Sequence, residues 1–474
     1  MQGDPFASPS HVSIQISHRD TGFPVEYYKD TLTGTTLCDY LTRQFEKQVS
    51  QYSFRAKGSG KSGLLTASHC GQEILSRTAC EITEKGITAR FFVGFPANGR
   101  TINATELEKI LFDFLPVCIQ KSFFYSSLNA KELQNYIELA EDQEFIRQTL
   151  PAKNLCAFIA DGSILPRESG ISSRPMKASI PFTSPDSLRI SINLPHKGKI
   201  TGMGIPKGIT LIVGGGYHGK STLLNALELG VYNHIPGDGR EYVITDATAV
   251  KLRSEDGRFI KDVDISMFIN DLPNKKDTRC FSTLDASGST SQAAGIVESM
   301  EAGSHLFLLD EDTSATNFMV RDAFMQQVIQ REKEPITPFL ERAEDLYKKA
   351  GISTILVAGS SGAFFHIADT IIQMDNYVPK DITASVKKLC SQYPLPAVSV
   401  TDFQLPHSHR IMSRPAESSK RLIHNSRGNH SDSGAAKPER LKTRISGTDG
   451  FSLADRRLIS AIQNSLLTQN RPLP

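Results

Sequence analysis

The chain lacks several features that would assign it to a special class of protein. No run of eighteen apolar residues occurs, so nothing predicts a membrane span. The first ten residues, MQGDPFASPS, lack the apolar stretch of a secretory signal. The formal net charge is only +2, so binding to nucleic acid or membrane would need a local basic patch. These absences favour a soluble globular protein.

Cysteine is scarce and has no paired spacing. The seven cysteines are odd in number and none forms a C-x-x-C pair. This pattern argues against a disulfide framework or a zinc site. We therefore expect a reducing compartment, which fits the cytoplasm and leaves an organelle matrix open.

The length of 474 residues predicts two or three domains. Residues 1–195 alternate short β-like runs, such as 12–16 and 87–95, with helical stretches such as 133–149, which predicts an N-terminal α+β domain. Within it, residues 161–184 are rich in Gly, Ser, Pro and Arg and are typical of an irregular connector.

Residues 196–395 have a different pattern, in which apolar β-branched runs are each followed by a polar or glycine turn and then a helix. Such alternation predicts an α/β domain with a largely parallel, buried sheet. The expected strands are Ile209–Val213, 242–245, 305–309, 352–357 and 370–374.

The C-terminal part differs again. Residues 396–450 are expected to be a flexible basic linker, because their segment 407–446 holds nine Lys or Arg against three Asp or Glu and few large apolar residues. Residues 451–474 have apolar side chains at helical spacing, which predicts a short amphipathic helix.

The clearest motif is GGGYHGKST at residues 214–222, which satisfies G-x-x-x-x-G-K-[ST]. An apolar strand enters it and a helix is expected over 222–229, whose N-terminus favours an anion. A chance glycine-rich loop is the alternative. The motif predicts ATP binding with these candidate residues: Gly214, Gly215, Gly216, His218, Gly219, Lys220, Ser221 and Thr222.

The residue types fit phosphate chemistry. Glycines let backbone amides turn towards phosphate oxygens. Lys220 supplies a positive charge to the β and γ phosphates, which makes it a catalytic candidate, and Ser221 offers a hydroxyl to Mg²⁺.

A second glycine-rich stretch, GSGKSG at 58–63, looks similar but has Arg55 where the motif needs glycine, and a polar segment precedes it. We expect a flexible surface turn there, although Lys61 and the amides could contact phosphates of another ligand.

Two carboxylates follow an apolar run about 90 residues after the P-loop. Asp310 would end a buried strand and hold Mg²⁺, and Glu311 would orient and deprotonate the attacking water. Between the two motifs, ASGSTSQ at 286–292 precedes an expected helix over 292–300 and suits an anion-facing helix start, with a plain N-cap as the alternative.

The order of these motifs resembles that of ABC-type ATPases. Their amino-acid sequences are most similar to those of one non-transporter group, the predicted ATPases of the ABC class. The resemblance covers most of residues 2–390. It rests on the segments QGDPFASPS, GQEILSRTA, EDQEFIRQ, DGSILPRESG, GIPKGITLIVGGGYHGKSTLL, PGDGREYV, DVDISMFINDLP, ASGSTSQAA, LLDEDTSATNFM and EPITPFLERAEDLY.

The resemblance implies an ABC-type P-loop ATPase domain with an N-terminal α+β domain and a small C-terminal segment. It implies that Lys220, Ser221 and Thr222 contact phosphate and magnesium. It also implies Asp310 on Mg²⁺ and Glu311 as the catalytic base. Ser287 and Gly288 would face the γ-phosphate bound to a second subunit, so the resemblance implies an ATP-dependent homodimer.

The sequence departs from the ABC pattern in several places. Ser289 replaces the second signature glycine, and VAGSS at 357–361 stands where a switch histidine is expected. Ser360 could substitute for it, whereas we expect His366 to pack. We identify no Q-loop glutamine and no adenine-contacting aromatic. Because this family is expected to extend upstream of Gln2, we also expect a shortened N-terminal domain.

Three hypotheses cover what ATP drives. The first is coupling to RNA or another single-stranded nucleic acid through basic segments at 407–446, 55–61 and 167–177. The second is a transporter subunit, which the missing membrane span disfavours. The third is a nucleotide-gated scaffold with little turnover, which the missing switch histidine favours.

Overall fold

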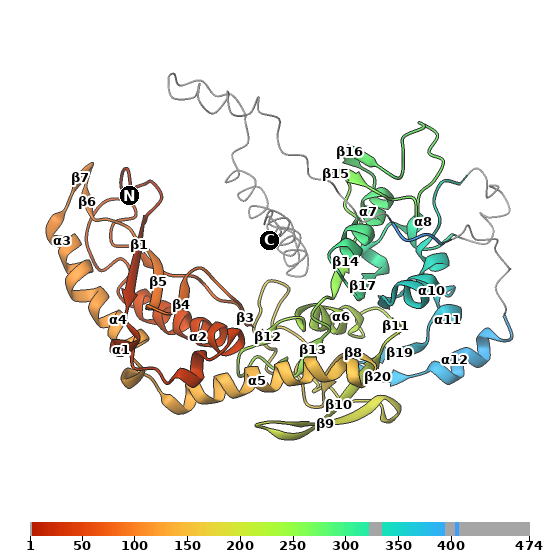
Figure 1. The fold of residues 1–474 in the computed structure, drawn as a ribbon, viewed down its shortest axis with the longest axis horizontal. Helices are drawn as coiled ribbons and strands as arrows, with labels where there is room; N and C mark the ends of the chain where they lie inside the picture. The colour runs from red at the N-terminus through yellow and green to blue at the C-terminus, as the bar shows by residue number, and fades with distance from the viewer. Residues whose placement is uncertain (1, 322–333, 394–402, 407–474) are drawn as a thin grey trace, which may run out of the picture. The chain divides into compact units, whose positions relative to one another are not determined.

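A computed structural model describes residues 2–321, 334–393 and 403–406 of the chain, which divides into two compact units (Figure 1). The first unit comprises Met1–Lys207, Gly214–Ala247 and Gln373–Asp381, and the second comprises Gly208–Val213, Thr248–Ile372 and Ile382–Pro474. The predicted basic segment 407–446 and the predicted helix in 451–474 lie outside the described residues.

The N-terminal part of the first unit is a small antiparallel sheet packed on helices. Strand β5 (Gly86–Val93) pairs with β1 (Ser10–Ile16), β4 (Cys80–Thr83) and β2 (Leu65–Thr66). Helix α2 (Thr31–Ser50) begins at a capping box and buries its apolar side chains in the core that this sheet shares. The predicted strands at 12–16 and 87–95 are confirmed.

A buried carboxylate of α2 binds two side chains from other parts of the chain. Asp39 of α2 is fully buried and accepts hydrogen bonds from Arg43 Nε at 2.7 Å and from the Tyr136 hydroxyl at 2.7 Å, and Arg77 also forms an ion pair with it. A buried charge is tolerated only when it is paired and hydrogen-bonded, so this network fixes α2 against its neighbours.

A second antiparallel sheet of the first unit has the order β13-β8-β10-β9. Helix α5 (Ala130–Ala152) precedes it and confirms the predicted helix at 133–149. The run at 242–245, expected in the parallel sheet, is instead strand β13 (Val243–Thr245), which pairs antiparallel with β8 (Leu155–Ala160). Strand β8 lies between β13 and β10 in this sheet, and every one of its residues is buried. Residues 161–184 form the predicted irregular connector.

The remaining α-helices and β-strands described for the first unit include β9 and β10 of this second sheet. They are α1 (His18–Thr21), β3 (Glu73–Ile74), β6 (Ala97–Asn98), β7 (Thr101–Ile102), α3 (Ala104–Glu108), α4 (Leu115–Phe123), β9 (Arg189–Leu194), β10 (Gly198–Pro206), α6 (Lys220–Leu229), β12 (Asn233–His234) and β20 (Val378–Asp381).

The second unit contains strands β14, β17, β18 and β11, which are neighbours in this order in one sheet and pair in parallel. Strand β18 (Ser353–Val357) pairs in parallel with β17 (Leu306–Asp310) on one side and with β11 (Ile209–Val213) on the other. Strands β17 and β18 are buried throughout, so the predicted parallel buried sheet is confirmed for these strands. The register places Asp310 and Ile212 on either side of Val357, at the carboxyl edge.

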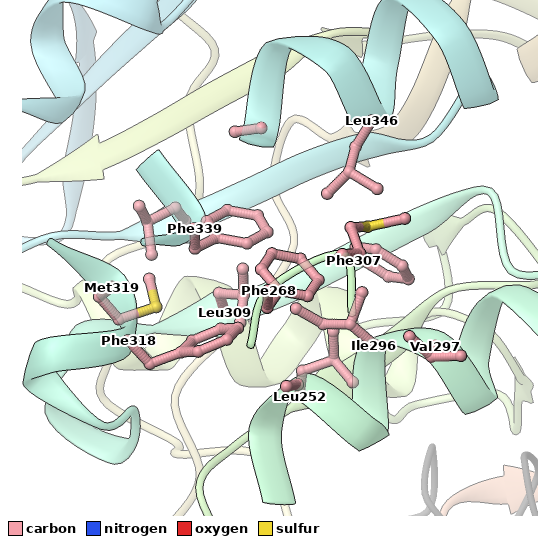
Figure 2. Close-up of a cluster of buried hydrophobic side chains, with 14 of the residues drawn as sticks. Leu252, Phe268, Ile296, Val297, Phe307, Leu309, Phe318, Met319, Phe339 and Leu346 are labelled. Atoms are coloured by element: carbon pink, nitrogen blue, oxygen red, sulfur yellow. The ribbon is translucent and has the colours of Figure 1, made fainter. Parts of the chain in front are cut away.

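Helices cover this sheet and share one apolar core with it (Figure 2). Phe307 and Leu309 of β17 pack there with side chains from helices α7 and α10, including Ile296 and Phe339. The other described elements of the unit are β14 (Val250–Leu252), β15 (Arg258–Val263), β16 (Phe281–Ala286), α7 (Gly288–Glu301), α8 (Thr316–Met319), α10 (Phe339–Ala350), α11 (Phe364–Ile367), β19 (Thr370–Asp375) and α12 (Thr383–Cys390).

Candidate functional site

The P-loop has the backbone that its glycines allow. Gly214 and Gly219 have φ values of +142° and +97°, which L side chains rarely adopt. Helix α6 begins at Lys220, two residues before the predicted start, and its first intrahelical bond runs from Leu223 N to Gly219 O at 3.0 Å. The amides of residues 220–222 precede that bond, so the helix N-terminus presents donors to an anion.

The lysine side chain folds back over this loop. Lys220 Nζ donates to the carbonyl oxygens of Gly214 at 2.7 Å and Gly215 at 2.9 Å. These are neutral acceptors, and a phosphate oxygen would be a stronger, charge-assisted partner for the same ammonium group. We therefore expect the lysine ammonium group to exchange these carbonyl acceptors for phosphate oxygens when a phosphate binds.

The turn after β19 supports the loop from one side. Asn376 N donates to His218 Nδ1 at 3.0 Å, and Tyr377 N donates to His218 O at 3.0 Å. A Cβ on Gly219 would lie 2.7 Å from the Tyr377 ring, so only glycine fits that close approach. His218 thus acts within the loop through its hydrogen bonds to this turn.

A shallow apolar hollow adjoins the P-loop within the first unit. Its empty volume, open solvent included, is about 230 Å³. Gly219 and Thr222 contribute to its lining, and the apolar walls come from the 161–184 connector and the end of β19. Those walls are Leu165, Pro166, Ile180, Phe182, Met374 and Tyr377.

A buried charge network holds the connector in place. Asp238 Oδ2 lies 2.7 Å from His234 Nδ1 and 2.8 Å from an Arg167 guanidinium nitrogen, and the Asp238 side chain is fully buried. Burial alone would raise the pKa of Asp238, but hydrogen bonds from His234 and Arg167 hold that pKa below its ordinary value. Arg167 is therefore committed to this ion pair.

Arg240, from the PGDGREYV segment, joins the connector to the P-loop helix. Its Nε donates to Leu165 O at 2.9 Å and its guanidinium also reaches Asn225 O of α6 at 3.5 Å. Burial lowers the pKa of Arg240 to about 10, which leaves it protonated near neutral pH. One wall of the hollow is thus fixed to α6 by a buried cation.

The carboxylate pair follows β17, as predicted. Asp310 is the last residue of the strand and is buried, and its Oδ1 accepts a hydrogen bond from Asp312 N at 3.2 Å. Glu311 comes next and binds the loop of residues 359–361, which directly follows the neighbouring strand β18.

The Glu311 carboxylate accepts four hydrogen bonds from this 359–361 loop. Oε2 accepts from Gly359 N at 2.6 Å and Ser360 N at 2.9 Å. Oε1 accepts from Ser360 Oγ at 2.5 Å and Ser361 N at 3.1 Å. Partial burial alone would raise the pKa of Glu311, but these donors hold that pKa below its ordinary value.

The predicted signature starts helix α7. Ser287 is the N-cap and Gly288 the first helical residue, four residues earlier than the helix start expected from sequence. Gln292 is fully buried and bonds the segment after the carboxylates, where its Nε2 donates to Ser314 Oγ at 2.9 Å and its Oε1 accepts from Ala315 N at 2.9 Å. The signature helix and the 312–317 segment are therefore one hydrogen-bonded assembly.

The predicted metal ligands carry oxygen donors. Within the described ranges, no group of three or more His, Cys, Asp and Glu could hold a metal by itself. The predicted ligands are the Ser221 hydroxyl and the Asp310 carboxylate. Hard oxygen donors in small number fit Mg²⁺, which usually keeps waters and substrate phosphates as further ligands.

The 58–63 stretch forms a turn in which several backbone amides donate hydrogen bonds to carbonyl oxygens of the protein itself. Lys61 N donates to Pro5 O at 2.7 Å, Ser59 N to Ala97 O at 2.9 Å, and Gly63 N to Gly94 O at 2.9 Å. These three donors are engaged, which distinguishes this turn from the P-loop. His366, on α11, is half-buried.

The predicted site residues fall in both units. Residues 214–222 belong to the first unit, and Asp310, Glu311, Ser287 and Gly288 belong to the second. Sequence reasoning missed Gln292, Arg240 and the 359–361 amides as participants. The sequence signal for Gln292 and Arg240 was their presence in two segments of the resemblance, ASGSTSQAA and PGDGREYV.

A glycine-rich phosphate loop after a parallel strand, with a carboxylate pair after a second strand, defines a P-loop ATPase. Residues 129–408 match the P-loop domain of the ABC ATPase family, and residues 1–126 match the ATPase of the ABC class N-terminal domain. The chain therefore belongs to the ATPases of the ABC class. This confirms the predicted family and the predicted P-loop ATPase domain with an N-terminal domain.

Individual proteins show more distant similarity. Uncharacterized protein MJ1628 of Methanocaldococcus jannaschii is 31% identical over 266 residues, which span 53% of this chain and 58% of that protein. MJ1267, an ATP-binding cassette of an ABC transporter in its ADP conformation, is 13% identical with a TM-score of 0.27, covering 41% of this chain and 88% of its own. The structure of cbiO1 from Clostridium perfringens, part of the ABC transporter complex cbiONQ, is 13% identical with a TM-score of 0.26. The match covers 40% of this chain and 86% of the cbiO1 chain.

Proposed function

We propose that this ABC-class ATPase binds ATP with Mg²⁺ at residues 214–222 and hydrolyses it. The observation that carries the proposal is the P-loop itself, in which Lys220 Nζ donates to the Gly214 and Gly215 carbonyls and the first amides of α6 precede the first intrahelical bond. Lys220 and these amides bind the phosphates, and Ser221 with Asp310 holds the metal. When bound, Mg²⁺ neutralises charge that develops on the phosphates. Glu311 accepts the proton of the attacking water.

We also propose that the adenine ring packs against the apolar side chains beside the P-loop. Tyr377 and its apolar neighbours offer a surface for a purine face, and they line the same hollow as Gly219 and Thr222 of the P-loop. Tyr377→Ala should weaken ATP binding much more than binding of tripolyphosphate, which has no base. Equal weakening of both ligands would show that Tyr377 acts on the loop and not on the base.

The first test is ATP turnover of the full chain beside Lys220→Ala. We expect turnover to fall at least about a hundredfold, because the phosphates lose their charge-assisted partner. Lys61→Ala is the matched control, since Lys61 lies in a similar glycine-rich turn whose amides are engaged elsewhere. Turnover that survives Lys220→Ala would place hydrolysis elsewhere or in a contaminant.

Dimerisation is the next proposal. The motif that begins α7, Ser287-Gly288, would complete the ATP site of a second copy, since a helix N-terminus favours the γ-phosphate. Sedimentation of Glu311→Gln with ATP tests it, because slowed hydrolysis should preserve the dimer. A monomer at micromolar protein would contradict the proposal.

For the coupled partner we propose single-stranded nucleic acid, probed as RNA. Its basis is the basic segment 407–446, which lies outside the described residues, and the exposed Arg174 and Lys177 of the connector. Arg167 is excluded from this role by its ion pair with Asp238. RNA binding should fall steeply with salt and weaken on deletion of 407–446. Salt-independent binding, or binding unaffected by the deletion, would contradict it.

A nucleotide-gated scaffold is the second candidate function. The four hydrogen bonds on Glu311 favour it, because a fully engaged carboxylate is a poor base. It predicts tight ATP binding with turnover near background. The transporter alternative has one relevant finding: within the described ranges, no helix is long and apolar enough to cross a membrane.

A further inference from the structure

The contact between Glu311 and the 359–361 loop uses the full hydrogen-bonding capacity of the carboxylate. An ionised carboxylate offers about four lone-pair positions on its two oxygens. Here each oxygen accepts two hydrogen bonds, three from backbone amides and one from the Ser360 hydroxyl. No acceptor position is left for a water molecule. In this conformation Glu311 cannot orient or deprotonate the attacking water.

We propose that the 359–361 loop is an autoinhibitory element that holds Glu311 inactive, that ATP binding opens it only in part, and that Ser360 controls how far it opens. This inference rests on the proposed function, because it concerns the base of the proposed hydrolysis. It differs from the scaffold candidate, since the inhibition is reversible and the base is retained.

The fold explains why this loop reaches Glu311. Strands β17 and β18 are parallel neighbours, and Asp310 pairs with Val357 in their register. The chain therefore leaves both strands at the same edge, with Glu311 one residue beyond β17 and Gly359 two residues beyond β18. Successive amides of a turn converge on one anion in this way, and the carboxylate of Glu311 takes that place.

The loop is also sparsely packed. Ala358 is buried and anchors its start, whereas Gly359 and Ser360 are exposed. A Cβ added at Gly359 would meet no atom within 4 Å, so no packing contact surrounds that position. Opening the loop therefore loses the four hydrogen bonds but little packing. Of the four donors, only the Ser360 hydroxyl is specified by a side chain.

The variant that tests the proposal is Ser360→Ala, which removes one hydrogen bond to a charged acceptor. We expect kcat for ATP to rise about tenfold with little change in KM, because such a bond stabilises the closed state by an amount of that order. Ser360→Thr keeps the hydroxyl and should restore turnover close to that of the parent. Ser361→Ala keeps its amide, so it reports any general effect of removing a hydroxyl from this loop.

Hydrogen exchange supplies a readout that needs no catalysis. In the parent without nucleotide, the amides of residues 359–361 should be protected, and Glu311→Ala should remove that protection. Saturating ATP with Mg²⁺ should speed their exchange in the parent but not in Lys220→Ala. Protection that ATP leaves unchanged would overturn the proposal, because ATP binding would then not release the base.

The outcomes separate the two proposals. A fall in kcat for Ser360→Ala, or no change, would show that the loop positions Glu311 or is irrelevant, and the autoinhibitory proposal fails. Turnover that is absent in the parent but appears in Ser360→Ala and depends on Lys220 would support both proposals. Absence of Lys220-dependent turnover in both proteins would refute hydrolysis and, with it, control of hydrolysis by the loop.

Discussion

Replacing Gln292 should destabilise the second unit by an amount that the structure allows us to estimate. Its buried side chain amide makes one hydrogen bond to Ser314 Oγ and accepts one from Ala315 N. A typical hydrogen bond contributes about 1 kcal/mol to stability, so Gln292→Met, which keeps the volume, should cost about 2 kcal/mol. Gln292→Ala also leaves a cavity and should cost about 1–2 kcal/mol more.

Urea denaturation followed by circular dichroism measures this cost, since the chain has no tryptophan to report by fluorescence. Gln392→Ala is the control, because Gln392 is exposed and its loss should change the midpoint little. If Gln292→Met is as stable as the parent while Gln292→Ala is not, Gln292 serves packing and its hydrogen bonds contribute nothing measurable. That result would refute the argument that they join α7 to the 312–317 segment.

Two further predictions concern the first unit. Tyr136→Phe should lower the free energy of unfolding by about 1.5–3 kcal/mol, because the lost hydroxyl donates to Asp39, which is buried and paired with two arginines; an unchanged melting temperature would contradict this. Asp238→Asn should destabilise at pH 7, and the difference from the parent should shrink as the pH falls below about 4. The pKa of Asp238 is lowered by folding, so its carboxylate stabilises above the unfolded value of 3.8 and loses that effect as it is protonated. A difference in melting temperature that stays the same from pH 7 to pH 3 would refute this assignment.

Much of the phosphate-binding half of the site could be predicted from local sequence. The G-x-x-x-x-G-K-S spacing fixes which residues turn the backbone, and the apolar run before it identifies β11. The same holds for Asp310 at the end of β17, because a buried strand followed by two carboxylates is contiguous in the chain. A local sequence pattern is enough to predict a structural feature when the feature is formed by residues that are neighbours in the chain.

Contacts between distant residues could not be predicted in this way. The four hydrogen bonds on Glu311 join residues 48 to 50 positions apart and depend on β17 and β18 being neighbours. Strand β13 was assigned to the wrong sheet for the same reason, since an apolar run does not specify its partner. The Asp39 network was missed because only Arg43 lies at helical spacing from it, whereas Arg77 and Tyr136 come from other elements.

The central claim is that Lys220 and Glu311 act on the same ATP, one in binding and the other in hydrolysis. The most direct test measures ATP affinity and turnover together for Glu311→Gln. We predict an affinity within a few-fold of the parent and a turnover at least about a hundredfold lower, because the phosphates keep their partners while the base is lost. Turnover at the parent's rate would contradict the account, since Glu311 would then have no part in the reaction.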